Sequence, residues 1–167
     1  MKKGFVSSIV SAVFAVLALI GIGLDFIMVT VTNGNTTEGE SGTFGEWLDV
    51  IKELNDAGSE KVAMWNVASW LMWIVLVIVL VAVAAAVIKN FINLGVLRTI
   101  AKICGIVGII ASLGWFVVFF AGCSNLTYGI NQFSIMYLPS IGSCMFGGGL
   151  FAASIAALVS SKKVKSA

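Results

Sequence analysis

The sequence contains no histidine, so it lacks both the commonest metal ligand and the commonest general base near neutral pH. Its three cysteines, Cys104, Cys123 and Cys144, form no CxxC pair and no zinc-ligand spacing. Phosphate-binding loops and nucleophile elbows are also missing from the sequence. These absences argue against an enzyme. We therefore expect no catalytic residue, no cofactor and no bound metal.

Charge is scarce as well. Only 11% of the 167 residues are charged, 59% are hydrophobic, and the mean hydropathy is +1.06. A soluble domain of this length needs more charge to cover its surface. We expect one domain, residues 1–167, whose surroundings are the lipid bilayer, and we expect no nucleic acid partner.

The sequence does contain four long apolar runs, at about residues 5–31, 62–88, 96–121 and 140–159. Continuous apolar runs of this length predict membrane-spanning helices, whereas the strands of a membrane barrel would alternate in polarity. A signal peptide is the alternative for the first run. That run is longer than the usual signal-peptide core and no small-x-small cleavage site ends it, so we expect a retained helix. The predicted fold is an all-α membrane protein with a four-helix transmembrane bundle.

The two signs of charge are segregated along the chain. Seven of the eight acids lie in residues 32–61, which also hold Lys52 and Lys61, so this loop has a net charge of −5. Eight of the ten basic residues lie at the ends of the chain or around the second and third runs: Lys2, Lys3, Lys89, Arg98, Lys102, Lys162, Lys163 and Lys165. Short loops rich in Lys and Arg stay in the cytoplasm. The pattern predicts a multi-pass protein of the cell membrane, with cytoplasmic termini and external loops at 32–61 and 122–139.

The first external loop contains the signature of a short amphipathic helix. It opens with turn-forming residues, Asn33, Gly34 and Asn35. Thr43 and Glu46 then fit a capping box that starts a helix at Phe44 and carries it to about residue 57. One face of this helix is apolar and consists of Phe44, Trp47, Leu48, Ile51 and Leu54. Such a helix is expected to lie on the bilayer surface or to cap the bundle.

Small residues recur at helical spacing in the third and fourth runs, and they predict close helix packing. They are Gly105, Gly108, Cys144, Gly148, Ala152 and Ala156. Helices in a bilayer associate through close backbone approach, which small side chains permit. Packing within one chain and packing between copies are both consistent with the pattern. The Gly147–Gly149 triplet suggests close helix contact in preference to a flexible break.

Two further positions are candidate sites. Asp25 is the only charge well inside an apolar run, and helical rise places it roughly 10 Å from the middle of that run towards the outside. We weigh a hydrated or paired carboxylate near the outer headgroups against an ion or proton site. Cys123 and Cys144 both lie in the outer half of the predicted topology, where a disulfide between them is a second hypothesis.

This topology resembles that of the claudin-like tetraspan proteins. Their first outer loop carries a paired-cysteine signature after a tryptophan, and the corresponding loop here has no cysteine. The cysteine-glycine motif of the tetraspanins is missing as well, so we assign no family. The expected function is a structural, scaffold or accessory subunit that binds other membrane protein subunits or its own copies. The alternative is a small channel or transporter subunit that uses Asp25.

Overall fold

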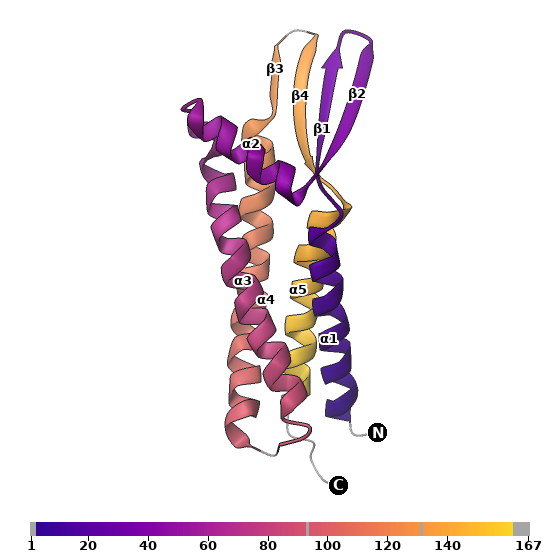
Figure 1. The fold of residues 1–167 in the computed structure, drawn as a ribbon, viewed down its shortest axis with the longest axis vertical. Helices are drawn as coiled ribbons and strands as arrows, with labels where there is room; N and C mark the ends of the chain where they lie inside the picture. The colour runs from indigo at the N-terminus through magenta and orange to yellow at the C-terminus, as the bar shows by residue number, and fades with distance from the viewer. Residues whose placement is uncertain (1–2, 93, 131, 162–167) are drawn as a thin grey trace. The chain divides into compact units, whose positions relative to one another are not determined.

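The computed structural model describes residues 3–92, 94–130 and 132–161 (Figure 1). The predicted cytoplasmic residues Lys2, Lys162, Lys163 and Lys165 lie outside these ranges. Helices and strands follow one another as α1 (Lys3–Ile22), β1 (Asp25–Asn33), β2 (Thr36–Thr43), α2 (Phe44–Asp56), the 3-10 helix η1 (Glu60–Val62), α3 (Ala63–Ile88), α4 (Gly95–Leu126), β3 (Tyr128–Ile130), β4 (Phe133–Pro139) and α5 (Ile141–Ser160).

Four helical segments in the described part of the chain are long and apolar enough to cross a membrane. They are Gly4–Ile22, Glu60–Ile88, Gly95–Leu126 and Ile141–Ser160, one for each predicted apolar run. The fold is mostly helical, as the sequence predicts. The bounds differ at two places, because the first helix stops at Ile22 and the third continues to Leu126.

The prediction of an all-α protein is wrong, because residues 25–33 form strand β1 and not the end of a helix. The sequence here reads Asp-Phe-Ile-Met-Val-Thr-Val-Thr-Asn. The residues from Val29 to Thr32 are all β-branched, and apolar valine alternates with polar threonine. Such residues favour extended backbone. Helix α1 ends at Ile22, and Gly23 follows it at the start of a turn. Both segments are largely apolar, so hydropathy does not separate the helix from the strand in the sequence.

The end of the first predicted span and parts of the two predicted loops together form one antiparallel sheet with the strand order β2-β1-β4-β3 (Figure 1). Strands β1 and β2 form one hairpin, and β3 and β4 form the other. The hairpins are joined by β1 and β4, which pair from Ile27 opposite Pro139 to Asn33 opposite Phe133. The predicted turn at Asn33–Asn35 is confirmed. Gly34 has a φ of +61°, and its N–H donates to the Gln132 carbonyl at 2.9 Å.

The chain divides into two compact units. The first unit comprises Met1–Ala18, Trp73–Gly114 and Gly147–Ala167, and the second comprises Leu19–Met72 and Trp115–Phe146. The sheet and α2 belong to the second unit. Each of the four long helices contributes residues to both units.

The helices of the first unit expose many large aliphatic side chains. Large aliphatic side chains such as Val13, Val77 and Ile110 are exposed. The buried positions among its described residues include six serines: Ser8, Ser11, Ser112, Ser154, Ser160 and Ser161. In a protein surrounded by water, so many large aliphatic side chains would not be exposed along the same helices. The outer faces of these helices therefore suit contact with lipid.

Buried serine hydroxyls connect the helices of the first unit. Ser8 Oγ donates to the Ala86 carbonyl at 2.7 Å, which joins α1 to α3. Ser11 Oγ donates to the Ala153 carbonyl at 2.7 Å, which joins α1 to α5. Hydrogen bonds of this kind hold apolar helices together where the hydrophobic effect does not.

Lys89 caps the C-terminal end of α5. Its ammonium donates to the Ser160 hydroxyl at 2.8 Å and also to the Ser160 carbonyl. The last carbonyls of a helix have no partner within the helix, and a cation near them is favourable. Burial of the ammonium, followed by the nearby charge of Arg98, lowers the pKa of Lys89. The turn after α3 is thereby fixed to the end of α5.

Glycines allow close helix contacts in the first unit, but not all at the predicted positions. Gly105 and Gly108 of α4 lie against Ser154 of α5. A Cβ at Gly149 would lie 2.9 Å from the Ala18 Cβ and 2.9 Å from the Phe14 carbonyl oxygen of α1. A Cβ at the neighbouring Gly148 would meet nothing within 4 Å. Within the first unit, the close contact between α1 and α5 at this position therefore depends on Gly149.

Replacement of these two neighbouring glycines by alanine should have opposite consequences. Gly149→Ala should lower the melting temperature in detergent, since overpacking of this kind costs about 1–3 kcal/mol. Gly148→Ala should leave it unchanged or raise it slightly, because alanine is the better helix former. Thermal unfolding of the two variants beside the wild type measures this difference. Equal effects of both changes would contradict the contact.

Candidate functional site

Aromatic side chains form the core of the second unit. Six of them are buried: Phe26, Trp47, Trp65, Trp115, Phe119 and Phe146. The Phe26 ring centroid lies 5.3 Å from that of Trp47 and 5.6 Å from that of Phe119. Trp115 stacks on Phe119 at 5.0 Å. The cluster joins β1, α2, α3, α4 and α5 of this unit.

A β-bulge at the start of β1 directs two consecutive side chains into this unit. The pairing of β1 with β2 shifts between Asp25 and Ile27, so Phe26 has no partner in the ladder. In a regular strand, neighbouring residues point to opposite faces. The bulge changes this, and both Phe26 and Ile27 are buried while Asp25 is exposed.

Helix α2 is confirmed, together with its capping box. The Thr43 side chain accepts from the Glu46 N–H, and the Glu46 carboxylate accepts from the Thr43 N–H. Trp47 and Ile51 of the predicted apolar stripe are buried, while its other members Phe44, Leu48 and Leu54 are half-buried. The stripe packs on the aromatic cluster, where the ring centroids of Trp47 and Trp65 are 6.0 Å apart.

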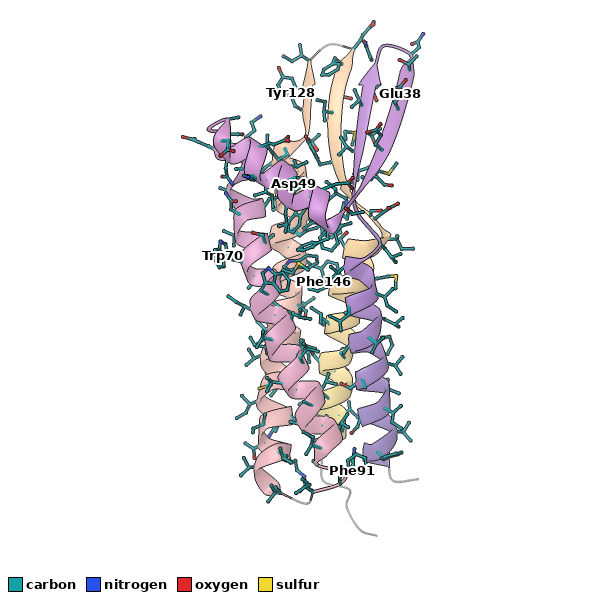
Figure 2. The ribbon with its side chains drawn as sticks, in the orientation of Figure 1. Glu38, Asp49, Trp70, Phe91, Tyr128 and Phe146 are labelled. Carbon is teal, nitrogen blue, oxygen red and sulfur yellow. The ribbon has the colours of Figure 1, made fainter. Side chains whose placement is uncertain are left out.

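Helix α2 is also hydrogen-bonded to α3, and its acidic side chains are exposed to solvent. The side-chain amides of Asn55 and Asn66 exchange two hydrogen bonds at 2.9 and 2.8 Å. Asp49, Glu53 and Asp56 are exposed on the opposite face, and Figure 2 shows Asp49 on this helix. A fixed helix therefore presents an acidic surface.

Asp25 does not lie in a helix, as the predicted span required, because α1 ends at Ile22. It is the exposed first residue of β1, and its carboxylate accepts a hydrogen bond from the Ser41 hydroxyl at 2.6 Å. The ammonium of Lys61, a candidate partner for Asp25, lies 5.5 Å from the centre of the Tyr128 ring. The contact of Asp25 therefore helps to hold the β1–β2 hairpin.

The three cysteines are free thiols in the structure. Cys123 is buried in α4, while Cys144 is exposed near the start of α5. Cys104 packs against a cluster of buried alanines in the first unit. A disulfide between Cys123 and Cys144 stays a prediction.

The two faces of the sheet differ in chemistry. On one face the paired residues form rows that run across the strands, such as Glu40, Val29 and Tyr137 in one row and Glu38, Val31, Ile135 and Tyr128 in the next. The opposite face has mixed rows, such as Ser41, Met28 and Leu138, or Gly39, Thr30 and Met136. We call the first the apolar face. We call the part of this face next to α3 its base. There the ring centroids of Tyr137 in β4 and Trp65 in α3 are 5.3 Å apart.

The outer part of the apolar face is exposed. Tyr128 and Ile130 of β3 are 44% and 54% exposed, and Phe133 of β4 is exposed as well. Burial raises the pKa of Tyr137 near the base of this face. Apolar side chains that stay exposed together on a fixed sheet are characteristic of a contact surface.

The two edges of the sheet are unequal. Strand β3 has three residues, whereas β2 has eight, all exposed except the half-buried Gly42. Figure 2 shows Tyr128 and Glu38 on these opposite edges. Glu38 and Glu40 both project from β2 on the apolar face, since they are two residues apart. An acidic margin therefore borders the apolar face along its longer edge.

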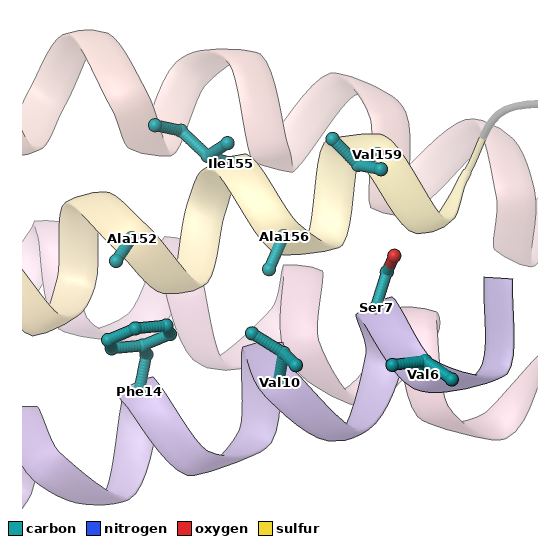
Figure 3. Close-up of a pocket in the computed structure, with 8 residues that line it drawn as sticks. All are labelled: Val6, Ser7, Val10, Phe14, Ala152, Ile155, Ala156 and Val159. Atoms are coloured by element: carbon teal, nitrogen blue, oxygen red, sulfur yellow. The ribbon is translucent and has the colours of Figure 1, made fainter. Parts of the chain in front are cut away.

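The first unit contains an apolar groove between α1 and α5 with a volume of about 310 Å³ (Figure 3). Its lining is apolar apart from one hydroxyl: Val6, Ser7, Val10, Phe14, Ala152, Ile155, Ala156 and Val159. The predicted packing residues Ala152 and Ala156 thus lie along this groove, while Cys144 lies in the second unit. The lining suits a hydrocarbon chain and not a polar substrate.

Residues 3–92, 94–130 and 132–161 contain no group of three or more His, Cys, Asp or Glu side chains that could hold a metal ion. No protein-family model matches the sequence, and no curated protein matches it significantly. The sheet, its acidic edge and α2 are therefore the features from which a function can be argued. Sequence reasoning missed the sheet, although the alternation from Val29 to Thr32 was a signal for its central strand.

Two tryptophans of the aromatic cluster should differ in their tolerance of replacement by phenylalanine. The indole N–H of Trp115 donates to the Ala68 carbonyl at 3.1 Å, whereas the buried N–H of Trp47 has no partner among the described residues. Trp115→Phe loses a hydrogen bond, but Trp47→Phe removes an unsatisfied donor. Trp115→Phe should therefore destabilise the protein by about 1 kcal/mol more.

Unfolding of both variants by denaturant in the same detergent measures the two free energies. Both changes reduce ring volume equally, so each variant is the control for the other. An equal or larger loss for Trp47→Phe would contradict the assigned hydrogen bonding.

Proposed function

We propose that this chain is a multi-pass protein of the cell membrane that acts as a structural, scaffold or accessory subunit through contacts with other proteins. The exposed aliphatic side chains and buried serines of the first unit support the membrane location. So does Trp70 of α3, which is 76% exposed and projects away from its helix in Figure 2. Exposed tryptophan near the end of an apolar helix is typical of the membrane interface.

One observation carries the proposal of a binding role. The segments between α1 and α3 and between α4 and α5 are far apart in the sequence, and they pair into one sheet. An aromatic core and α2 support this sheet from the same unit. A surface that is already ordered and that exposes apolar side chains is well suited to bind a protein, because few of its residues lose conformational freedom on binding.

The orientation follows from the charges. In the proposed topology Lys89, Arg98 and Lys102 are cytoplasmic, together with both termini. The acidic segment that contains β2 and α2 is then external, and the β3–β4 hairpin with it. The sheet and α2 would meet partners outside the cell or in an equivalent compartment.

Labelling of single cysteines tests the orientation. In a background without Cys104, Cys123 and Cys144, we expect Ser41→Cys to react with a membrane-impermeant thiol reagent from outside. Ser166→Cys should react only after the membrane is made permeable. Reaction of both from the same side would exclude the proposed topology.

Extraction in mild detergent tests the binding role. We expect the protein mass of the particle, without its detergent, to exceed the 17.6 kDa of one chain. The additional mass would come from a second protein or from further copies. Replacement of Tyr128 and Ile130 by serine should reduce this association, because both lie on the exposed part of the apolar face. Met136→Ser on the opposite face, also exposed, is the matched control. A strictly monomeric particle without a partner would overturn the proposal.

The alternative function, a channel or transporter subunit that uses Asp25, has less support. An ion site within the membrane needs a charge on a spanning helix or in a cavity between helices. Asp25 is the exposed first residue of β1, and Ser41 on the neighbouring strand is its hydrogen-bond partner.

A further inference from the structure

Strand β2 has an unpaired edge. It is the terminal strand of the sheet, and in the described part of the chain it pairs only with β1. Its eight residues, Thr36–Thr43, include no proline that would interrupt a further ladder. An exposed edge strand offers a row of backbone N–H and C=O groups to another extended segment. The opposite edge, β3, is only three residues long and offers much less.

The side chains of β2 indicate which kind of segment this edge would accept. Glu38 and Glu40 lie on the same face, opposite Val31 and Val29 of β1. A strand added beyond β2 would place its own alternate side chains directly beside these two carboxylates. Lysine or arginine at those positions would be favoured, whereas acidic residues would be repelled.

A second copy of β2 fits this edge poorly. In a symmetric antiparallel pair centred on Gly39, Glu38 of each copy would face Glu40 of the other. Like charges directly opposite one another in a sheet are destabilising. The charge of the edge therefore favours a different chain over self-pairing.

We propose that the edge of β2 binds an extended segment of a partner protein that carries Lys or Arg at alternate positions. The segment adds a fifth strand to the sheet through backbone hydrogen bonds, and its basic side chains pair with Glu38 and Glu40. This inference rests on the proposed binding role and names the surface and the chemistry of the partner.

The test uses the full chain in lipid nanodiscs and a synthetic peptide of alternating lysine and valine as the probe. We expect the peptide to bind and to slow hydrogen exchange at the amides of β2. The double variant Glu38→Gln/Glu40→Gln should weaken binding by about tenfold, as expected for the loss of two cross-strand ion pairs. Asp49→Asn/Glu53→Gln on α2 is the matched control, with the same change of charge, and should bind nearly as the wild type does.

A second peptide separates strand addition from simple attraction between charges. It has the same sequence, but every backbone nitrogen is methylated, so it cannot donate ladder hydrogen bonds along either edge. We expect this methylated peptide to lose binding. Equal binding by the methylated and unmethylated peptides, or equal weakening by the α2 control variant, would overturn the proposal.

Two further outcomes keep this inference distinct from the proposed function. If the peptide fails to bind and Glu38→Gln/Glu40→Gln instead promotes dimers of the chain, the occupant of the edge is a second copy and the proposal is wrong. If a partner co-purifies but its association is unaffected by the double variant, the edge proposal fails while the binding role stands. A monomer without any partner would overturn the binding role itself.

Discussion

The burial of Phe26 is the interaction on which the second unit depends. Its ring contacts Phe44, Trp47, Trp115, Phe119 and Phe146, which come from α2, α4 and α5. Its carbonyl accepts a hydrogen bond from the Ser140 N–H at 3.3 Å, next to the start of α5. Because Phe26 is the bulged residue of β1, the same position sets the direction in which the strand leaves the core. The pairing of β1 with β2 and β4 follows from that direction.

The sequence was sufficient for the features that depend on local chemistry. Continuous hydropathy indicated four helices, and the Thr43–Glu46 spacing located the start of α2. Glycine at position 34 marked a turn that requires a positive φ. Each of these signals lies within a few residues of the element that it predicts, so no knowledge of distant contacts was needed.

The sheet could not be predicted in the same way, because its central pairing joins distant segments. Strand β4, Phe133–Pro139, pairs with β1 although α2, α3 and α4 lie between the two strands in the sequence. No local sequence pattern encodes the register of this pairing. The apolar start of β1 also merged with α1 in a hydropathy window. Only the Val-Thr alternation after Met28 distinguished strand from helix. Asp25 was misplaced for the same reason, since its depth was measured along a helix that ends at Ile22.

Helix packing shows a similar limit at the level of single residues. Gly148 and Gly149 are equivalent in composition, yet only Gly149 faces the backbone of α1. Neighbouring residues on a helix point about 100° apart, so the choice between them depends on the rotation of α5 about its axis. That rotation is set by contacts such as the Ser11 hydrogen bond to Ala153, which no pattern in the sequence reveals.

The glutamates of β2 satisfy two requirements at once. A long exposed edge next to an apolar face is a site of uncontrolled strand pairing, and charged side chains on the edge are a common protection. Protection by a single sign of charge is not neutral, however. It disfavours copies of the same edge and acidic segments, and it leaves basic segments as those whose pairing is favoured. The same two carboxylates that would keep the chain from pairing with itself therefore restrict the partners that its sheet can accept.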